Sequence, residues 1–218
     1  MRKLLALLAT TTALTIAFDA VAEDEAPPAE EKPTIQMGKI TEFNGTWEKA
    51  AAIDTRLGDM HKGVMAAHEQ TKAAAGVATD APIEKAFEDM KATAGDKLVV
   101  SIEAGQAPKL SAADDAPENV KTFAMEADKA VSALSAVKDD AMKLKEEATA
   151  LVGEAAAIPA SITPELIKNS GLKKPKEIKA EKDLQAANVE IVKTFPTQAD
   201  NVISAATEFV TLVQSLAN

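Results

Sequence analysis

The sequence predicts an all-α protein, an elongated antiparallel bundle of four to five long, alanine-rich helices with coiled-coil-like packing. Alanine is the commonest residue, 45 of 218, and it is the best intrinsic helix former. Apolar residues recur at alternating steps of three and four over long stretches, the period of a packed helix face. With six Phe, one Trp and no Tyr or Cys, the helices must be held together by close packing of small side chains.

The first 22 residues have the organisation of a cleavable signal peptide. Arg2 and Lys3 precede an apolar run over 4–18, and Ala20-Val21-Ala22 is the small-x-small pattern of a cleavage site. The run is shorter than the roughly 20 residues of a membrane span, although an uncleaved anchor is the alternative. We expect cleavage near Ala22 and a periplasmic or secreted protein.

Residues 23–45 are predicted to form a tether and the segment that leads into the bundle. The stretch 23–33 is acidic, rich in proline and without an apolar period, so it cannot bury enough surface to offset the cost of ordering. No element is assigned to 34–45. The helical-bundle domain is expected to span 46–218.

Two helices are predicted in the first half of this domain. An apolar stripe starts after Thr46 and is ended by Gly76, a residue suited to a helix C-terminus. Asp80 and Pro82 then have the spacing of a cap and a first-turn proline. The β-branched run 98–102 could form a strand by itself. Because no partner strand is evident, we expect it to end the second helix.

The third helix is the clearest element. From 117 to 158, large and alanine residues alternate at heptad spacing with one slip at Val137, and the helix would be about 60 Å long. Prolines at 159, 164 and 175 leave room for one short turn. A further helix should follow from Glu177 to Phe195. Pro196 is expected to break it and to start a final helix.

Composition and motifs argue against several classes of function. The formal net charge of −10 disfavours binding to nucleic acid phosphates. The lack of cysteine excludes disulfides and thiolate metal sites. Motifs of hydrolases and nucleotide-binding proteins are missing, so we expect no enzymatic activity and no cofactor.

One constellation has the chemistry of a metal site. His61, Met65 and His68 lie at i, i+4 and i+7, along one edge of a helix, and this ligand set suits copper. The two histidines would be about 10 Å apart along the axis, which is too far for one ion to bind both directly. The alternative is that they border the apolar stripe and make ordinary hydrogen bonds.

Two surfaces are candidates for binding. Lys173, Lys174, Lys176 and Lys179 could contact anions or lipid headgroups, although charge clusters are usually only solubilising. The final helix carries an apolar face that is either a partner-binding face or the central seam of the bundle. That face comprises Val202, Phe209, Val213 and Leu216.

The sequence therefore favours an exported, non-catalytic protein that acts through its helical surface as an envelope structural, assembly or chaperone-like binding protein. A protein partner or self-association is expected, and contact with a membrane surface is possible without a span. One alternative is an amphipathic-helix protein that binds lipid or an apolar ligand. Another is a periplasmic copper or haem binder that uses the His/Met edge.

Overall fold

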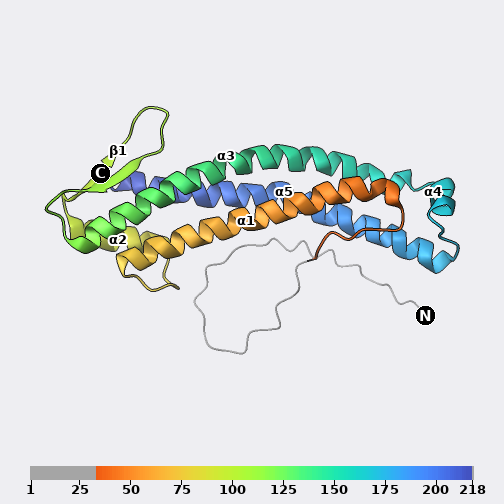
Figure 1. The fold of residues 1–218 in the computed structure, drawn as a ribbon, viewed down its shortest axis with the longest axis horizontal. Helices are drawn as coiled ribbons and strands as arrows, with labels where there is room; N and C mark the ends of the chain where they lie inside the picture. Colours follow the sequence, from red (N-terminus) through yellow and green to blue (C-terminus); the bar gives the residue numbers. More distant parts are fainter. Residues whose placement is uncertain (1–32, 218) are drawn as a thin grey trace, which may run out of the picture.

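The computed structural model describes residues 33–217, so the predicted signal peptide and residues 23–32 lie outside the described residues. Three long helices run side by side along the molecule (Figure 1): α1 (Asn44–Ala75), α3 (Glu118–Ser161) and α5 (Pro175–Ser215). α3 is antiparallel to the other two. Two short helices, α2 (Ile83–Ala94) and α4 (Pro164–Asn169), and a 3-10 turn, η1 (Thr41–Phe43), complete the helical elements. The predicted all-α, elongated antiparallel bundle is confirmed, with three of its five helices long.

The first helix ends where the sequence predicts. Gly76 adopts a left-handed backbone conformation, with φ of 69°, and its N–H donates to the carbonyl of Ala73. Glycine takes this conformation without the steric cost of a Cβ atom. The start of α2 is predicted less well, because Pro82 occupies the cap position and no side chain caps the helix.

The two prolines predicted to end helices lie inside them. α3 continues through Pro159 to Ser161, and α5 continues through Pro196 for almost twenty residues. The predicted break at Pro196 is therefore wrong. A proline inside a helix costs about 3 kcal/mol, but the apolar stripe of α5 continues without interruption past it. On either side of the proline, Val192, Phe195, Ala199 and Val202 are all buried, so packing offsets the lost hydrogen bond.

A β-hairpin replaces the predicted end of the second helix, and this is a second correction. α2 stops at Gly95, with φ of 59°, and β1 (Leu98–Ser101) then pairs in antiparallel fashion with β2 (Lys109–Ala112). Val99 and Val100 of β1 are β-branched and favour a strand. The partner strand was missed because Lys-Leu-Ser-Ala carries little strand propensity of its own.

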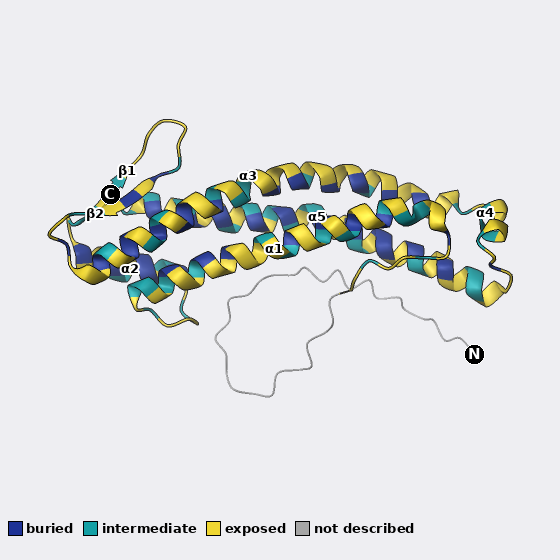
Figure 2. Ribbon diagram, viewed as in Figure 1, coloured by how far each residue is buried: buried dark blue, intermediate teal, exposed yellow. Residues whose placement is uncertain are grey.

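The core consists of two clusters along the length of the bundle, visible as buried stripes in Figure 2. Near the hairpin, Phe87 packs edge-to-face against Phe123 and Phe209, each with ring centroids 5.4 Å apart. Towards the other end, the largest buried side chains are Trp47 and Phe195. Alanines of α3 at heptad spacing lie between these large residues and allow close approach of the helices.

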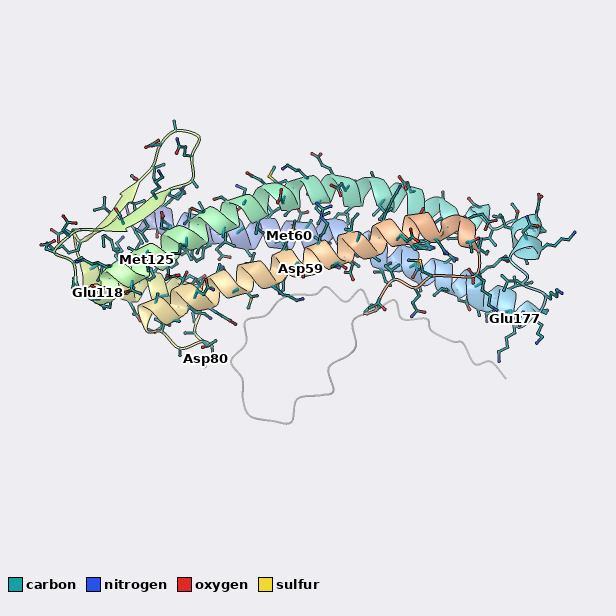
Figure 3. The ribbon with its side chains drawn as sticks, viewed as in Figure 1. Asp59, Met60, Asp80, Glu118, Met125 and Glu177 are labelled. Atoms are coloured by element: carbon teal, nitrogen blue, oxygen red, sulfur yellow. The ribbon has the colours of Figure 1, made fainter. Side chains whose placement is uncertain are left out.

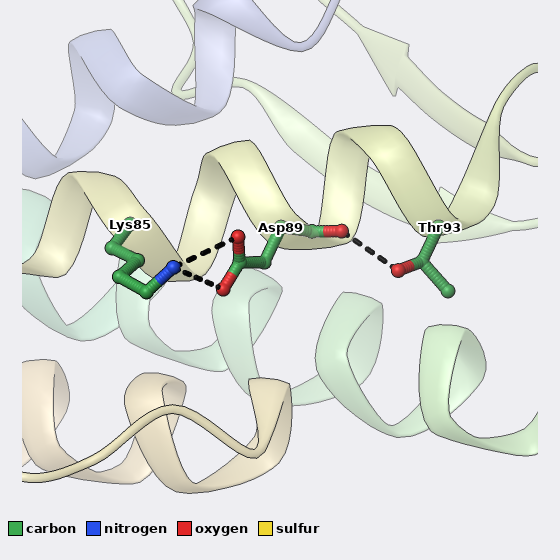
Figure 4. Close-up of polar contacts among 3 residues, drawn as sticks. All are labelled: Lys85, Asp89 and Thr93. Carbon is green, nitrogen blue, oxygen red and sulfur yellow. Dashed lines mark hydrogen bonds and ion pairs between the residues drawn. The ribbon is translucent and has the colours of Figure 1, made fainter.

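The outer faces of the helices carry local polar contacts. On α2, Lys85 forms an ion pair with Asp89 one turn later at 3.0 Å, and the hydroxyl of Thr93 donates to the backbone carbonyl of Asp89 at 2.8 Å (Figure 4). Such pairs are worth a few tenths of a kcal/mol. In the part of the chain that the structure describes, no helix is both long and apolar enough to span a bilayer.

Candidate functional site

The three residues of the predicted copper site lie in different surroundings. His61 and Met65 are exposed on α1. His68 is half-buried, and its ring stacks on Phe209 of α5 with centroids 5.5 Å apart and planes 20° from parallel. Between residues 33 and 217, no three His, Asp or Glu side chains are close enough to hold one metal ion. The structure thus places His68 against the core, and the other two side chains face solvent.

Burial also changes the acid–base behaviour of His68. Desolvation, reinforced by the positive charge of Lys72, lowers the pKa of the imidazole below its ordinary value of 6.5, and Glu84 opposes this effect. Its Nε2 atom is buried without a hydrogen-bond partner among the described residues. The neutral ring is therefore the form that fits this position.

The predicted lysine cluster is exposed at the start of α5. Lys173, Lys174, Lys176 and Lys179 all face solvent, beside the loop that follows α4. Glu177, labelled in Figure 3, accepts a hydrogen bond from the backbone N–H of Lys174 and lies 3.8 Å from its ammonium group. The lysine side chains are thus exposed to solvent, and Glu177 partly neutralises the charge of the cluster at Lys174.

The predicted partner face on α5 is covered by the same chain. Val202, Phe209 and Val213 are buried in the core and Leu216 is partly buried at its edge. These residues form the central seam, which is the alternative that the sequence left open. The structure therefore offers no free apolar face at these positions.

The most distinctive polar arrangement was not predicted. Three of the four buried polar or charged side chains among the described residues project from α5 on one stripe: Glu181, Gln185 and Asn188. We call these three side chains the N-terminal clamp, because together they hold the extended segment, residues 36–40, that precedes α1. A buried polar group is costly unless it is hydrogen-bonded, and each of the three is.

The clamp binds the backbone of the segment. The two carboxylate oxygens of Glu181 accept hydrogen bonds from the N–H groups of Lys39 at 3.0 Å and Ile40 at 3.2 Å. Asn188 forms two bonds with Gln36, accepting from its N–H at 3.1 Å and donating to its carbonyl at 2.7 Å. This two-bond pairing is the one that a neighbouring strand would make.

Gln185 joins the segment to the core. Its Nε2 donates to Glu181 at 2.8 Å, and its Oε1 accepts from the indole N–H of Trp47 at 2.6 Å. Gly38 passes so close that a Cβ atom there would lie 2.1 Å from Oε1 of Glu181. Any larger residue here would displace the Glu181 carboxylate or the segment, and with it the hydrogen bonds that this carboxylate accepts.

Surface hollows on the described residues are shallow. One lies between α2 and α5, where Glu84 faces Thr207 and Glu208, and another lies between β2 and α3 beside Met125, labelled in Figure 3. The hydroxyls of Ser111, Thr207 and Thr211 in these hollows donate to backbone carbonyls and not to a neighbouring carboxylate. No family model, curated protein or solved structure matches this chain.

Proposed function

We propose that the protein is an exported, non-catalytic bundle protein that acts through its helical surface as an envelope structural, assembly or chaperone-like binding protein. The observation that carries this proposal is the elongated body. α3 alone has 44 residues, which corresponds to roughly 66 Å of helix at 1.5 Å per residue. α1 and α5 accompany it along most of that length (Figure 1).

The stiffness expected of this close-packed bundle supports a role that depends on its elongated shape. The buried residues of α3 and α5 come from both core clusters, so the packing continues from one end of the bundle to the other. Ion pairs join the helices on the outside, including Arg56 with Glu147 at 2.8 Å and Lys145 with Asp200 at 2.7 Å. Each such exposed pair contributes little on its own, so the rigidity is chiefly that of the close-packed core.

The N-terminal clamp supports the same proposal. It fixes residues 36–40 on the side of α5 through backbone hydrogen bonds. A tether formed by the residues before Gln36 would therefore be attached to the bundle at one fixed position on the side of α5. This arrangement suits a protein that holds its bundle at a distance from an attachment site.

The proposal is tested by photo-crosslinking in the cells that express the protein. A crosslinking amino acid is placed at one exposed alanine on each long helix: Ala66, Ala150 and Ala186. We expect one protein to be captured in stoichiometric amount from one or two adjacent helices and not from all three. Capture of no protein from any position would contradict the proposal, as would a chain that retains residues 1–22 and stays in the cytoplasm.

The exposed lysine cluster supports a membrane-surface role as the alternative outcome. If the purified protein floats with anionic vesicles at low salt, replacement of Lys173, Lys174, Lys176 and Lys179 by Gln should abolish flotation. The matched control replaces four exposed lysines elsewhere: Lys62, Lys85, Lys129 and Lys143. Loss of flotation with both variants would indicate a general charge effect.

Copper that co-purifies with the protein and is lost with His61→Ala plus His68→Ala would instead support the metal-binding alternative.

A further inference from the structure

The two edges of the β-hairpin differ in how they are covered. Ala113 donates a 2.9 Å backbone hydrogen bond to Lys97, and paired residues in an antiparallel ladder alternate between bonded and non-bonded. Lys97 and Ala113 are thus a bonded pair, and Val100 and Leu110, three pairs further along the ladder, are a non-bonded pair. The backbone N–H and C=O groups of Val100 and Leu110 therefore point away from the hairpin. On the β2 side, Asp128 of α3 accepts from the N–H of Leu110 at 2.9 Å.

The edge of β1 has no such cover among the described residues. The two-stranded sheet places β1 beside β2 only, and the outward N–H groups of Leu98 and Val100 have no hydrogen-bond acceptor between residues 33 and 217. Val99 and Ile102 add exposed apolar surface at 49% and 55%. An uncharged, unpaired strand edge is a template for another strand.

The strand β1 and the residues that flank it form a stretch whose sequence is complementary to an antiparallel copy of itself. Residues 97–103 read Lys-Leu-Val-Val-Ser-Ile-Glu, and an antiparallel copy centred on Val100 places Lys97 opposite Glu103 at both ends. Leu98 then faces Ile102, and Val99 faces Ser101. In this register the outward peptide groups of Val100 in the two copies meet as a bonded pair, as the ladder requires.

We propose that β1 pairs with β1 of a second copy of this chain, so that the two hairpins form one four-stranded antiparallel sheet. Main-chain hydrogen bonds and apolar cross-strand pairs supply the affinity. The Lys97–Glu103 pairs chiefly set the register, since exposed ion pairs are weak. They form if the strand, which ends at Ser101 in the single chain, continues through residues 102 and 103 in the dimer. Lys97 already contacts Asp115 in its own chain, and Glu103 of the second copy would bind the same ammonium group. This contact does not depend on the proposed function.

The register is tested by disulfide crosslinking, for which the chain is suited because it has no cysteine. Full-length protein purified from expressing cells is prepared as Val99→Cys and as Ser101→Cys. Both residues are exposed, and in the proposed sheet each faces the other across a non-bonded pair, where side chains are closest. An oxidised mixture of the two should give several-fold more dimer than either variant alone. Equal or lower yield in the mixture would overturn the register and the proposal.

Sedimentation of the protein without cysteine substitutions provides a second measurement. We expect a monomer–dimer equilibrium that Val100→Pro weakens about tenfold or more, because proline removes the edge donor from both copies. Val100→Ala keeps that donor and is the matched control for the lost side chain. Far-UV circular dichroism checks that both variants remain folded. A chain that stays monomeric at concentrations up to about 1 mM would overturn the proposal.

Discussion

The indole Nε1 of Trp47 donates a 2.6 Å hydrogen bond to Oε1 of Gln185, and both side chains are fully buried although they lie 138 positions apart in the sequence. This bond joins α1 to α5 at the point where the N-terminal segment crosses them. Gln185 also donates to Glu181, which holds the backbone of Lys39 and Ile40. The glutamine therefore couples the docked segment to the core.

Replacing Gln185 by Leu should destabilise the protein. The substitution leaves the indole N–H of Trp47 without its acceptor and removes a donor to Glu181, and an unsatisfied buried group costs about 1–3 kcal/mol. We expect the free energy of unfolding in urea to fall by that amount. Because Trp47 is the only tryptophan, its fluorescence follows the transition directly. The control is Gln70→Leu, at an exposed position on α1, which should change the stability little.

Gly38→Ala should release the N-terminal segment while the bundle stays folded. The new Cβ would lie 2.1 Å from Oε1 of Glu181 and 2.4 Å from Nε2 of Gln185, so the segment and the clamp cannot keep their present positions. We expect faster hydrogen exchange at the amides of Lys39 and Ile40 and faster tryptic cleavage after Lys39.

Gly45→Ala is the matched control for this substitution. A Cβ atom at Gly45 meets nothing within 4 Å, and alanine favours the helix that begins beside it by up to about 1 kcal/mol. The control should leave exchange in the segment unchanged and stability equal or higher. If Gly38→Ala behaves in the same way, the close approach at Gly38 does not govern docking.

The sequence predicts the bundle because its evidence is periodic, and it misses features that depend on a distant partner. The heptad of α3 and the glycine after α1 are local signals, and both predictions are confirmed. The hairpin could not be predicted from β1, since β2 has weak strand propensity and is held by Asp128 of α3. No local sequence pattern predicts the hydrogen bond between Leu110 and Asp128.

The clamp did leave a signal in the sequence. The heptad at Ala199 and Val202 extends backwards across Pro196 through Phe195 and Val192 to Asn188, Gln185 and Glu181, without a change of step. A helix that ended at Pro196 would interrupt this pattern, whereas α5 continues through the proline. Three polar residues at the core positions of an unbroken heptad predict a buried polar network. Its acceptor, the backbone of an extended segment, could not be identified from sequence.

Pro196→Ala should stabilise the protein. Alanine restores the missing helical hydrogen bond and is about 3 kcal/mol better than proline in a helix interior, whereas the unfolded chain gains about 0.4–1 kcal/mol of conformational freedom. We expect the free energy of unfolding to rise by about 2–2.6 kcal/mol, measured by thermal and urea unfolding.

Pro159→Ala tests the same reasoning near a helix end. Pro159 is exposed and lies in the last turn of α3, where fewer hydrogen bonds depend on it, so its replacement should have a smaller effect. A loss of stability with Pro196→Ala would indicate that packing of the half-buried proline ring contributes more than the helix gains.

His68 should make the stability of the fold depend on pH. Burial and Lys72 lower its pKa in the folded protein below 6.5, so near and below that pH the unfolded chain binds more protons than the folded one. Unfolding is then favoured by acid, and the free energy of unfolding should fall as the pH drops from about 7.5 to about 5.5. Urea unfolding at a series of pH values measures this slope.

His68→Phe keeps a ring against Phe209 and removes the titrating group, so the slope of unfolding free energy against pH should be shallower than that of the unsubstituted protein. His61→Ala, at an exposed position on the same helix, is the control and should keep the original slope. If His68→Phe retains the full slope, the acid sensitivity belongs to other groups and the buried imidazole does not contribute to it.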